Sequence, residues 1–166
     1  MAVLVAHGGA GPWRGDRLPR ALRGLSRALS KGFSVLRAGG NALDAVEETV
    51  AALEDDEVFN AGRGSALNLV GEVEAEASIM DGRTLSAGAV ALVRSVRNPV
   101  RLARLVMEKT DHVLLVGRMA EELARAFGLE EANLKTEERV EMWDKWVGKL
   151  RAGEVRYFEK LPELLK

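Results

Sequence analysis

Residues 59–68 read Phe-Asn-Ala-Gly-Arg-Gly-Ser-Ala-Leu-Asn, a glycine-bearing stretch with two asparagines and one arginine. It follows a segment with helical periodicity and precedes a segment in which apolar and polar residues alternate. Glycine adopts backbone angles that other residues avoid, so we expect a structured loop here. This loop connects a helical part of the chain to a part made of strands, and that order of elements decides the fold class.

Two helices are expected before the loop. Five apolar residues recur at spacings of three and four and share one stripe of the first helix: Leu22, Leu25, Leu29, Phe33 and Leu36. Gly39-Gly40 ends that helix, Asn41 can cap the next one, and Asp44 lies in its positive first turn. A buried stripe is expected to continue there through Leu43, Val46, Val50 and Leu53.

An antiparallel hairpin is expected after the loop. Residues 73–80 alternate apolar with polar side chains, and Asp81-Gly82 offers a tight turn into residues 84–93. Asn98-Pro99 then opens another helix, since proline is favoured at the first helical position.

The remaining expected elements lie before the first helix and after the helix that begins at Pro99. Residues 2–6 form a short apolar run that predicts a buried strand leading into a glycine loop. A strand at 112–116 and helices at 119–127 and 137–150 follow the hairpin, and residues 151–166 are expected to form a mobile tail. This order of elements favours an α+β fold over a doubly wound parallel sheet.

Composition excludes several classes of function. The 166 residues include 24 basic and 25 acidic side chains, which predicts no nucleic-acid partner and no membrane surface. There are no cysteines, so disulfides, thiolate metal sites and thiol catalysis are excluded. Without a signal segment or a long apolar run, a cytoplasmic location is expected. The absence of glutamine beside many charged residues hints at a thermophilic source.

A glycine loop follows the expected first strand. His7, Gly8 and Gly9 lie where main-chain N–H groups can approach a reacting carbonyl, although many such loops are only tight turns. An esterase with this kind of loop would need a G-x-S-x-G nucleophile elbow. The run 62–66, Gly-Arg-Gly-Ser-Ala, has the wrong spacing for that motif.

Several motifs occur in the order found in one enzyme family. Together they closely resemble plant-type asparaginases and isoaspartyl peptidases over about residues 2–128. The motifs are His-Gly-Gly-Ala-Gly at 7–11, the stretch at 59–68, Ala-Ser-Ile-Met-Asp-Gly at 77–82, Ser-Ala-Gly-Ala-Val at 86–90, and Asn-Pro at 98–99 leading to Ala-Arg-Leu-Val-Met-Glu at 103–108.

The resemblance implies an αββα sandwich of the N-terminal-nucleophile hydrolase type, of which this chain supplies the N-terminal, or α, half. Residues 1–128 would belong to that sandwich, and residues 129–166 to a variable helical segment and linker toward the autocleavage site. In the family the nucleophile is the first residue of the β subunit, a Thr in a Gly-Thr-Val-Gly setting. No threonine here has that setting, so no catalytic residue is expected on this chain.

The implied activity belongs to the assembled protein. It is hydrolysis of L-asparagine to L-aspartate and ammonia, cleavage of β-aspartyl dipeptides, or both, by an (αβ)₂ heterotetramer. A non-catalytic ligand-binding or structural relative that does not mature is the alternative. Without the other half, the sheet face carrying Val73, Ala75, Ala77 and Ile79 is expected to lack its partner.

The resemblance also implies supporting residues on this chain. Asn60 would face the nucleophile, and His7, Gly8 and Gly9 would lie near the cleavage region. The alternative for Asn60 is a loop residue that satisfies local backbone, and the alternative for His7 is a structural histidine.

A structural Na⁺ or K⁺ ion is implied as well, with no organic cofactor. Main-chain carbonyls would bind it, those of Leu53, Glu54, Asp56, Phe59, Ala61 and Arg63. Oxygen donors suit such a hard cation. Without the resemblance, the acidic run at 54–57 would be interpreted as a solvated loop.

Overall fold

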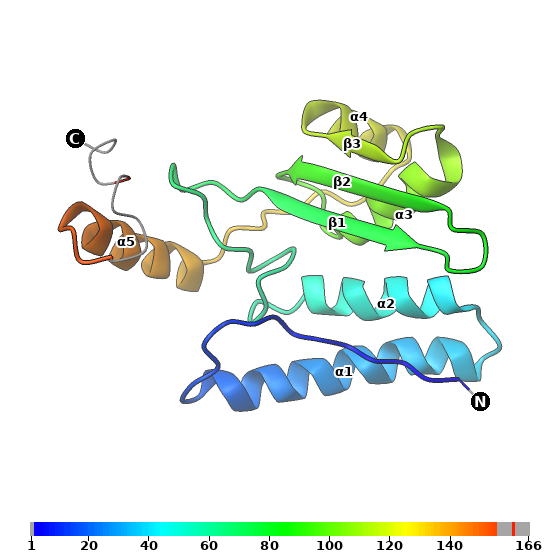
Figure 1. Cartoon of the computed structure of the whole chain (residues 1–166), viewed down its shortest axis with the longest axis horizontal. Coiled ribbons are helices and arrows are strands. Elements are labelled where there is room, and N and C mark those ends of the chain that lie inside the picture. The colour runs from blue at the N-terminus through cyan, green and yellow to red at the C-terminus, as the bar shows by residue number, and fades with distance from the viewer. Residues whose placement is uncertain (1, 156–160, 162–166) are drawn as a thin grey trace.

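A computed structural model describes residues 2–155 and 161 of the chain (Figure 1). The helices are α1 (Arg17–Arg37), α2 (Ala42–Glu54), α3 (Pro99–Lys109), α4 (Arg118–Ala126) and α5 (Glu137–Arg151). The strands are β1 (Ala75–Met80), β2 (Ala87–Val93) and β3 (Leu114–Val116). No described helix has the length and apolar character needed to cross a membrane.

The sheet has the order β1-β2-β3. The hairpin of β1 and β2 is antiparallel, as expected, and its turn begins at Asp81. β3 pairs with β2 in parallel after the crossover through α3. The described residues therefore form a mixed fold of helices with one small three-stranded sheet, without the second sheet of a sandwich.

Helices α3 and α4 lie behind one face of this sheet (Figure 1). The central hydrophobic core forms there, with Ile79 and Val90 from the sheet and Leu102 and Val106 from α3 all buried. The expectation that the face carrying Val73, Ala75, Ala77 and Ile79 lacks a partner is therefore wrong. Residues of the same face contact α3, α4 and the segment around Leu134.

The opposite face of the sheet is the one left uncovered. Met80, Leu114 and Val116 lie on it together with Ala89, and we call these four residues the open sheet face. Their large side chains are 56%, 52% and 44% exposed, respectively. A sheet buries at least one apolar face and normally leaves the other polar when it faces water.

Helices α1 and α2 pack together through small residues. α1 buries Ala21, Gly24, Ala28 and Gly32, and a Cβ on Gly32 would lie 1.9 Å from the Thr49 hydroxyl of α2. Because the axes come so close, the larger apolar residues lie to the side. Leu22 is 58% exposed and Val46 is 40% exposed, so the expected buried stripe of α2 is only partly buried.

The expected N-termini of α2 and α3 are confirmed. The Asn41 side chain accepts from the Asp44 N–H at 2.9 Å, and Asp44 accepts from the Asn41 N–H, which together form a capping box. Pro99 is the first residue of α3.

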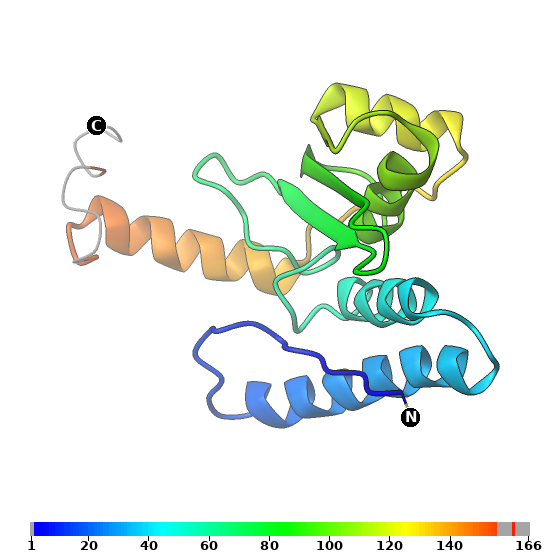
Figure 2. The ribbon, with the colours of Figure 1, turned by 45° about the vertical axis from the view of Figure 1, so that its right-hand side comes forward.

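The segment expected as a first strand does not pair with the sheet. Residues 2–9 run in extended form beside α1 (Figures 1 and 2). Val3 and Val5 are 76% and 84% exposed, because no neighbouring strand exists for them among the described residues. At the other end, α5 projects away from the sheet (Figure 2), and most of the expected tail at 151–166 lies outside the described residues.

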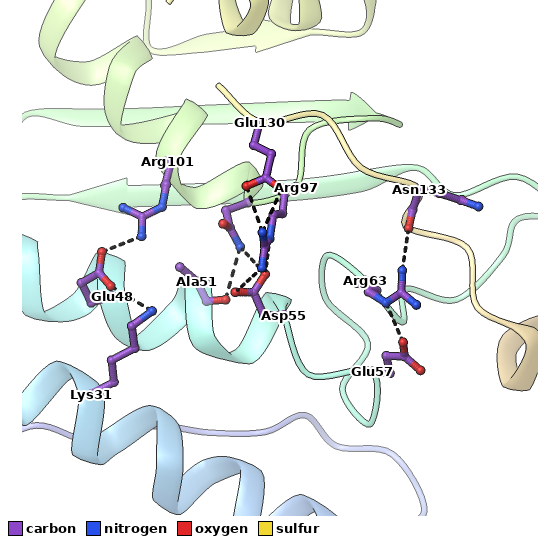
Figure 3. Close-up of polar contacts among 11 residues, drawn as sticks. Lys31, Glu48, Ala51, Asp55, Glu57, Arg63, Arg97, Arg101, Glu130 and Asn133 are labelled. Carbon is purple, nitrogen blue, oxygen red and sulfur yellow. Dashed lines mark hydrogen bonds and ion pairs between the residues drawn. The ribbon is translucent and has the colours of Figure 1, made fainter. Parts of the chain in front are cut away.

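Ion pairs join the helical layer to α3. Glu48 on α2 accepts from Arg101 of α3 at 2.6 Å and from Lys31 of α1 at 3.0 Å (Figure 3). Arg97, just before α3, pairs with Asp55 and Glu130 (Figure 3). Such partly exposed pairs each contribute little, so they fix orientation more than they add stability.

Glu54 is buried at the end of α2, where its Oε1 accepts from the Val100 N–H of α3 at 3.0 Å. Its Oε2 has no hydrogen-bond partner among the described residues. Burial raises the pKa of this carboxyl from 4.5 to about 8, against the smaller lowering by the Val100 hydrogen bond. Folding therefore favours the protonated form.

We expect a pH dependence of stability from this group. A raised folded-state pKa contributes stability that is fully present below 4.5 and is lost as the pH rises through about 8. Glu54→Gln keeps the shape of the protonated acid, so its free energy of unfolding should fall less between about pH 5 and about pH 8.5 than that of the wild type.

Urea unfolding followed by tryptophan fluorescence measures this difference. Glu76→Gln, which changes an exposed carboxylate on β1, is the matched control and should follow the wild type. Parallel pH profiles of Glu54→Gln and the wild type would contradict the assignment of a buried, protonated Glu54.

Candidate functional site

A pocket of about 490 Å³ lies where the N-terminal loop, the loop after α2 and helix α5 meet. Its walls come from segments that are far apart in the sequence. The residues that line it include His7, Gly8, Gly9, Trp13, Arg17, Phe59, Asn60, Ala66, Arg139 and Met142. The structure thus brings the four expected supporting residues, His7, Gly8, Gly9 and Asn60, into one pocket.

The glycine loop is held by local hydrogen bonds. The Gly9 N–H donates to His7 Nδ1 at 3.2 Å, and Trp13 Nε1 donates to the Gly9 carbonyl at 2.8 Å. Gly8 is required for packing, since a Cβ there would lie 2.8 Å from the Phe59 ring. His7 therefore accepts a backbone hydrogen bond at the pocket rim, as the structural interpretation of this residue predicts.

Asn60 lies at the start of the loop that opened the sequence analysis. Its Oδ1 accepts from the Ala66 N–H at 2.6 Å, across the turn that Gly62 and Gly64 make. The local role of Asn60 is thus visible in the structure, and Asn60 also lines the pocket. Its role toward a nucleophile stays a prediction.

The expected cation-binding loop closes on itself. The Arg63 N–H donates to the Glu54 carbonyl at 2.8 Å. Among the described residues, four of the six expected carbonyl donors accept hydrogen bonds, namely Leu53, Glu54, Asp56 and Phe59. A carbonyl oxygen has a second lone pair, so each of these oxygens can also accept a cation, and the cation site stays a prediction.

Side chains offer no alternative metal site in the described part of the chain. No group of three or more His, Cys, Asp or Glu residues is placed to hold an ion there. A cation in this loop would therefore depend on main-chain oxygens, for which sequence gives almost no signature.

Arg63 ties the loop to the segment before α5. Its Nε donates to Glu57 at 2.5 Å and its Nη1 to the Asn133 carbonyl at 3.4 Å (Figure 3). The loop that carries Asn60 is thereby fixed at both sides.

Sequence reasoning missed two arginines in the pocket wall. Arg17 opens α1, and Arg139 lies in the first turn of α5, within the segment expected to be a variable helix and linker. Arg139 Nη2 donates to the Phe59 carbonyl at 3.0 Å. An arginine on an amphipathic helix looks like a solvated charge in sequence, so only the packing of α5 could identify it.

We expect Gly62→Ala to destabilise the chain. Gly62 has φ +48°, and an added Cβ would lie 2.6 Å from both the Cβ and the carbonyl oxygen of Glu54. The left-handed conformation alone costs a non-glycine residue about 1–2 kcal/mol, and the clash adds to it. Thermal unfolding should show a lower melting temperature.

Gly82→Ala is the control for this prediction. No heavy atom lies within 4 Å of a Cβ built at Gly82, so its melting temperature should stay close to the wild type. Equal melting temperatures for the two variants would mean that the 54–64 loop is not closed as described.

Several known proteins are similar in sequence to this chain. The plant-type L-asparaginase of Pyrococcus horikoshii is 50% identical over 167 residues, a match that covers 100% of this chain and 54% of the relative. That of Thermococcus kodakarensis is 51% identical over 168 residues, with 100% and 55% covered. The isoaspartyl peptidase/L-asparaginase of Homo sapiens is 56% identical over 129 residues, with 78% and 42% covered.

Two facts follow from these matches. The chain spans about half the length of the curated relatives it matches. The likeness to the archaeal relatives also continues past residue 128, where we expected resemblance to weaken. With the asparaginase family matched over residues 1–162, the chain belongs to the family of plant-type L-asparaginases and isoaspartyl peptidases.

Proposed function

We propose that this chain is the α subunit of an autoprocessed amidohydrolase that acts on L-asparagine, on β-aspartyl dipeptides, or on both. The observation that carries the proposal is a family match along the whole chain that covers only about half of each archaeal relative. The other half, as a β subunit, would supply the nucleophile. Two αβ units would assemble into the heterotetramer.

The threonines of this chain support a nucleophile elsewhere. Each of the four makes a hydrogen bond to a residue three or four positions away: Thr49, Thr84, Thr110 and Thr136. None of them lines the described pocket. They act as turn, cap and helix residues.

The chemistry needs a threonine freed by cleavage. A hydroxyl is a weak nucleophile until a base takes its proton, and the α-amino group exposed on the same residue can serve as that base. The hydroxyl would attack the side-chain amide carbon, expel ammonia or an amino acid, and form an aspartyl ester. Water would then release aspartate, with donors to the oxyanion stabilising both tetrahedral states.

In this scheme the present chain supplies support and shape. Asn60 and the His7-Gly8-Gly9 loop would lie beside the reacting threonine, since they share one pocket. The open sheet face would pack against the β subunit, because apolar side chains more than 40% exposed on one sheet face favour a covering partner.

The proposal predicts that the 166-residue chain has no activity by itself. Expressed with its downstream half, the protein should mature and release aspartate from L-asparagine or from a β-aspartyl dipeptide. Replacing the first β residue, Thr, by Ala should abolish both cleavage and turnover while leaving a folded precursor.

Measured aspartate release from both substrates tests this directly, with intact mass to show maturation. Activity from the pure chain would overturn the proposal. A co-expressed protein that matures to no species beginning with Thr would favour the non-catalytic alternative.

A second prediction concerns the loop at residues 53–63. If its carbonyls bind Na⁺ or K⁺, the ion stabilises the native state by mass action. The melting temperature of the assembled protein should then rise with sodium chloride more than with choline chloride of equal ionic strength. The same rise in both salts would count against the site.

A further inference from the structure

Arg139 is a buried cation without a carboxylate partner in the part of the chain that the structure describes. The residue is 8% exposed. Its Nη2 donates to the Phe59 carbonyl, and its Nη1 lies 4.0 Å from Met142 Sδ. Taking an unpaired charge out of water is costly, so a buried guanidinium normally has an anion beside it.

Arg17 lies in the same pocket wall and is also incompletely satisfied. Its buried Nε has no hydrogen-bond partner among the described residues, and its nearest carboxylate is Glu138 at 3.9 Å. Its guanidinium donates to the Val58 carbonyl at 3.3 Å and lies 5.4 Å from the centre of the Trp13 ring.

The local charges do not balance. Glu138 is shared between Arg17 and Arg20, which pairs with it at 3.2 Å, and Arg139 has no ion pair in the described residues. Burial, followed by the repulsion of Arg17, lowers the pKa of the Arg139 guanidinium. Two guanidinium groups, those of Arg17 and Arg20, therefore share one carboxylate, while Arg139 pairs with none among the described residues. Arg17 and Arg139 both line the pocket.

We propose that Arg17 and Arg139 bind a carboxylate of the substrate in this pocket, namely the free carboxylate of the amino acid that leaves when a β-aspartyl dipeptide is cleaved. The inference rests on the proposed function. Guanidinium groups suit this ligand because their N–H groups form paired, charge-assisted hydrogen bonds to the two carboxylate oxygens.

The position of the arginines supports binding of the amino acid that leaves when the dipeptide is cleaved. The Arg139 contact to the Phe59 carbonyl places it one residue from Asn60, and both line the pocket. Ammonia, which leaves from asparagine, carries no carboxylate, whereas the leaving residue of a dipeptide does. The pair would therefore raise specificity for dipeptides over asparagine, while apolar Trp13, Phe59 and Met142 provide the remaining wall.

The test compares β-aspartyl-leucine with β-aspartyl-leucinamide on the assembled, matured protein. The two dipeptides differ only in the carboxylate that the arginines are proposed to bind. We expect kcat/KM to be at least about tenfold higher for the acid, because the loss of a hydrogen bond to a charged group has an effect of at least this size. The preference should appear mainly in KM.

Arg139→Met removes the charge while keeping an unbranched apolar stem. It should lower the acid-to-amide ratio of kcat/KM several-fold, because only Arg17 remains to bind the carboxylate. Arg139→Lys should give an intermediate ratio. Arg20→Met is the matched control, since Arg20 shares Glu138 but does not line the pocket, and it should keep the wild-type ratio.

Two outcomes overturn the inference while leaving the proposed function in place. One is a wild-type ratio near one in a protein that hydrolyses L-asparagine, a result that needs no folded variant. The other is an Arg139→Met protein that keeps the wild-type ratio. Hydrolysis of neither dipeptide nor of L-asparagine by the matured wild type would instead refute the proposed function itself.

Discussion

The Phe59 ring fills space that two glycines leave open. A Cβ on Gly8 would lie 2.8 Å from this ring, and a Cβ on Gly24 would lie 2.7 Å from it. Phe59 is 2% exposed, and its ring packs edge-on against the Trp13 ring, with 6.0 Å between the two ring centres. The N-terminal loop, α1 and the loop after α2 are thus fixed around one aromatic side chain, and the pocket forms where they meet.

This constraint explains why the candidate site has its particular composition. With the Phe59 side chain turned inward, its carbonyl is free to accept from Arg139, and the next residue, Asn60, lies in the pocket wall. The chain must then reverse sharply, which Gly62 makes possible with its positive φ. A residue that packs the core therefore also positions two polar groups of the site.

Locally encoded features of the fold could be predicted from the sequence. The Asn41 cap, the turn at Asp81 and the start of α3 at Pro99 each depend on a few neighbouring residues, and all three are confirmed. Which face of an element is buried depends on distant partners. Val46 was expected in the core and is 40% exposed, because small residues bring α1 and α2 together.

The same distinction applies to the candidate site. The motifs at 7–11 and 59–68 led to residues that share one pocket, because the family pattern already contains their tertiary relation. Arg139 could not be found this way. Its importance comes from the angle at which α5 meets the loop after α2, and the periodicity of a helix says nothing about that angle.

Several apolar side chains of this chain are exposed where a native protein would normally cover them. Val5 is exposed on an extended segment that has no strand partner among the described residues, and Met80 and Leu114 are exposed on the open sheet face. Apolar surface of this kind is normally covered in a native protein, and unpaired strand edges invite pairing. The chain aligns with about half of each archaeal relative, and under the proposed function a β subunit would cover this surface. Arg17 and Arg139 differ in kind, since a buried guanidinium needs an anion and not an apolar surface. This difference distinguishes the proposed substrate pocket from the proposed subunit interface.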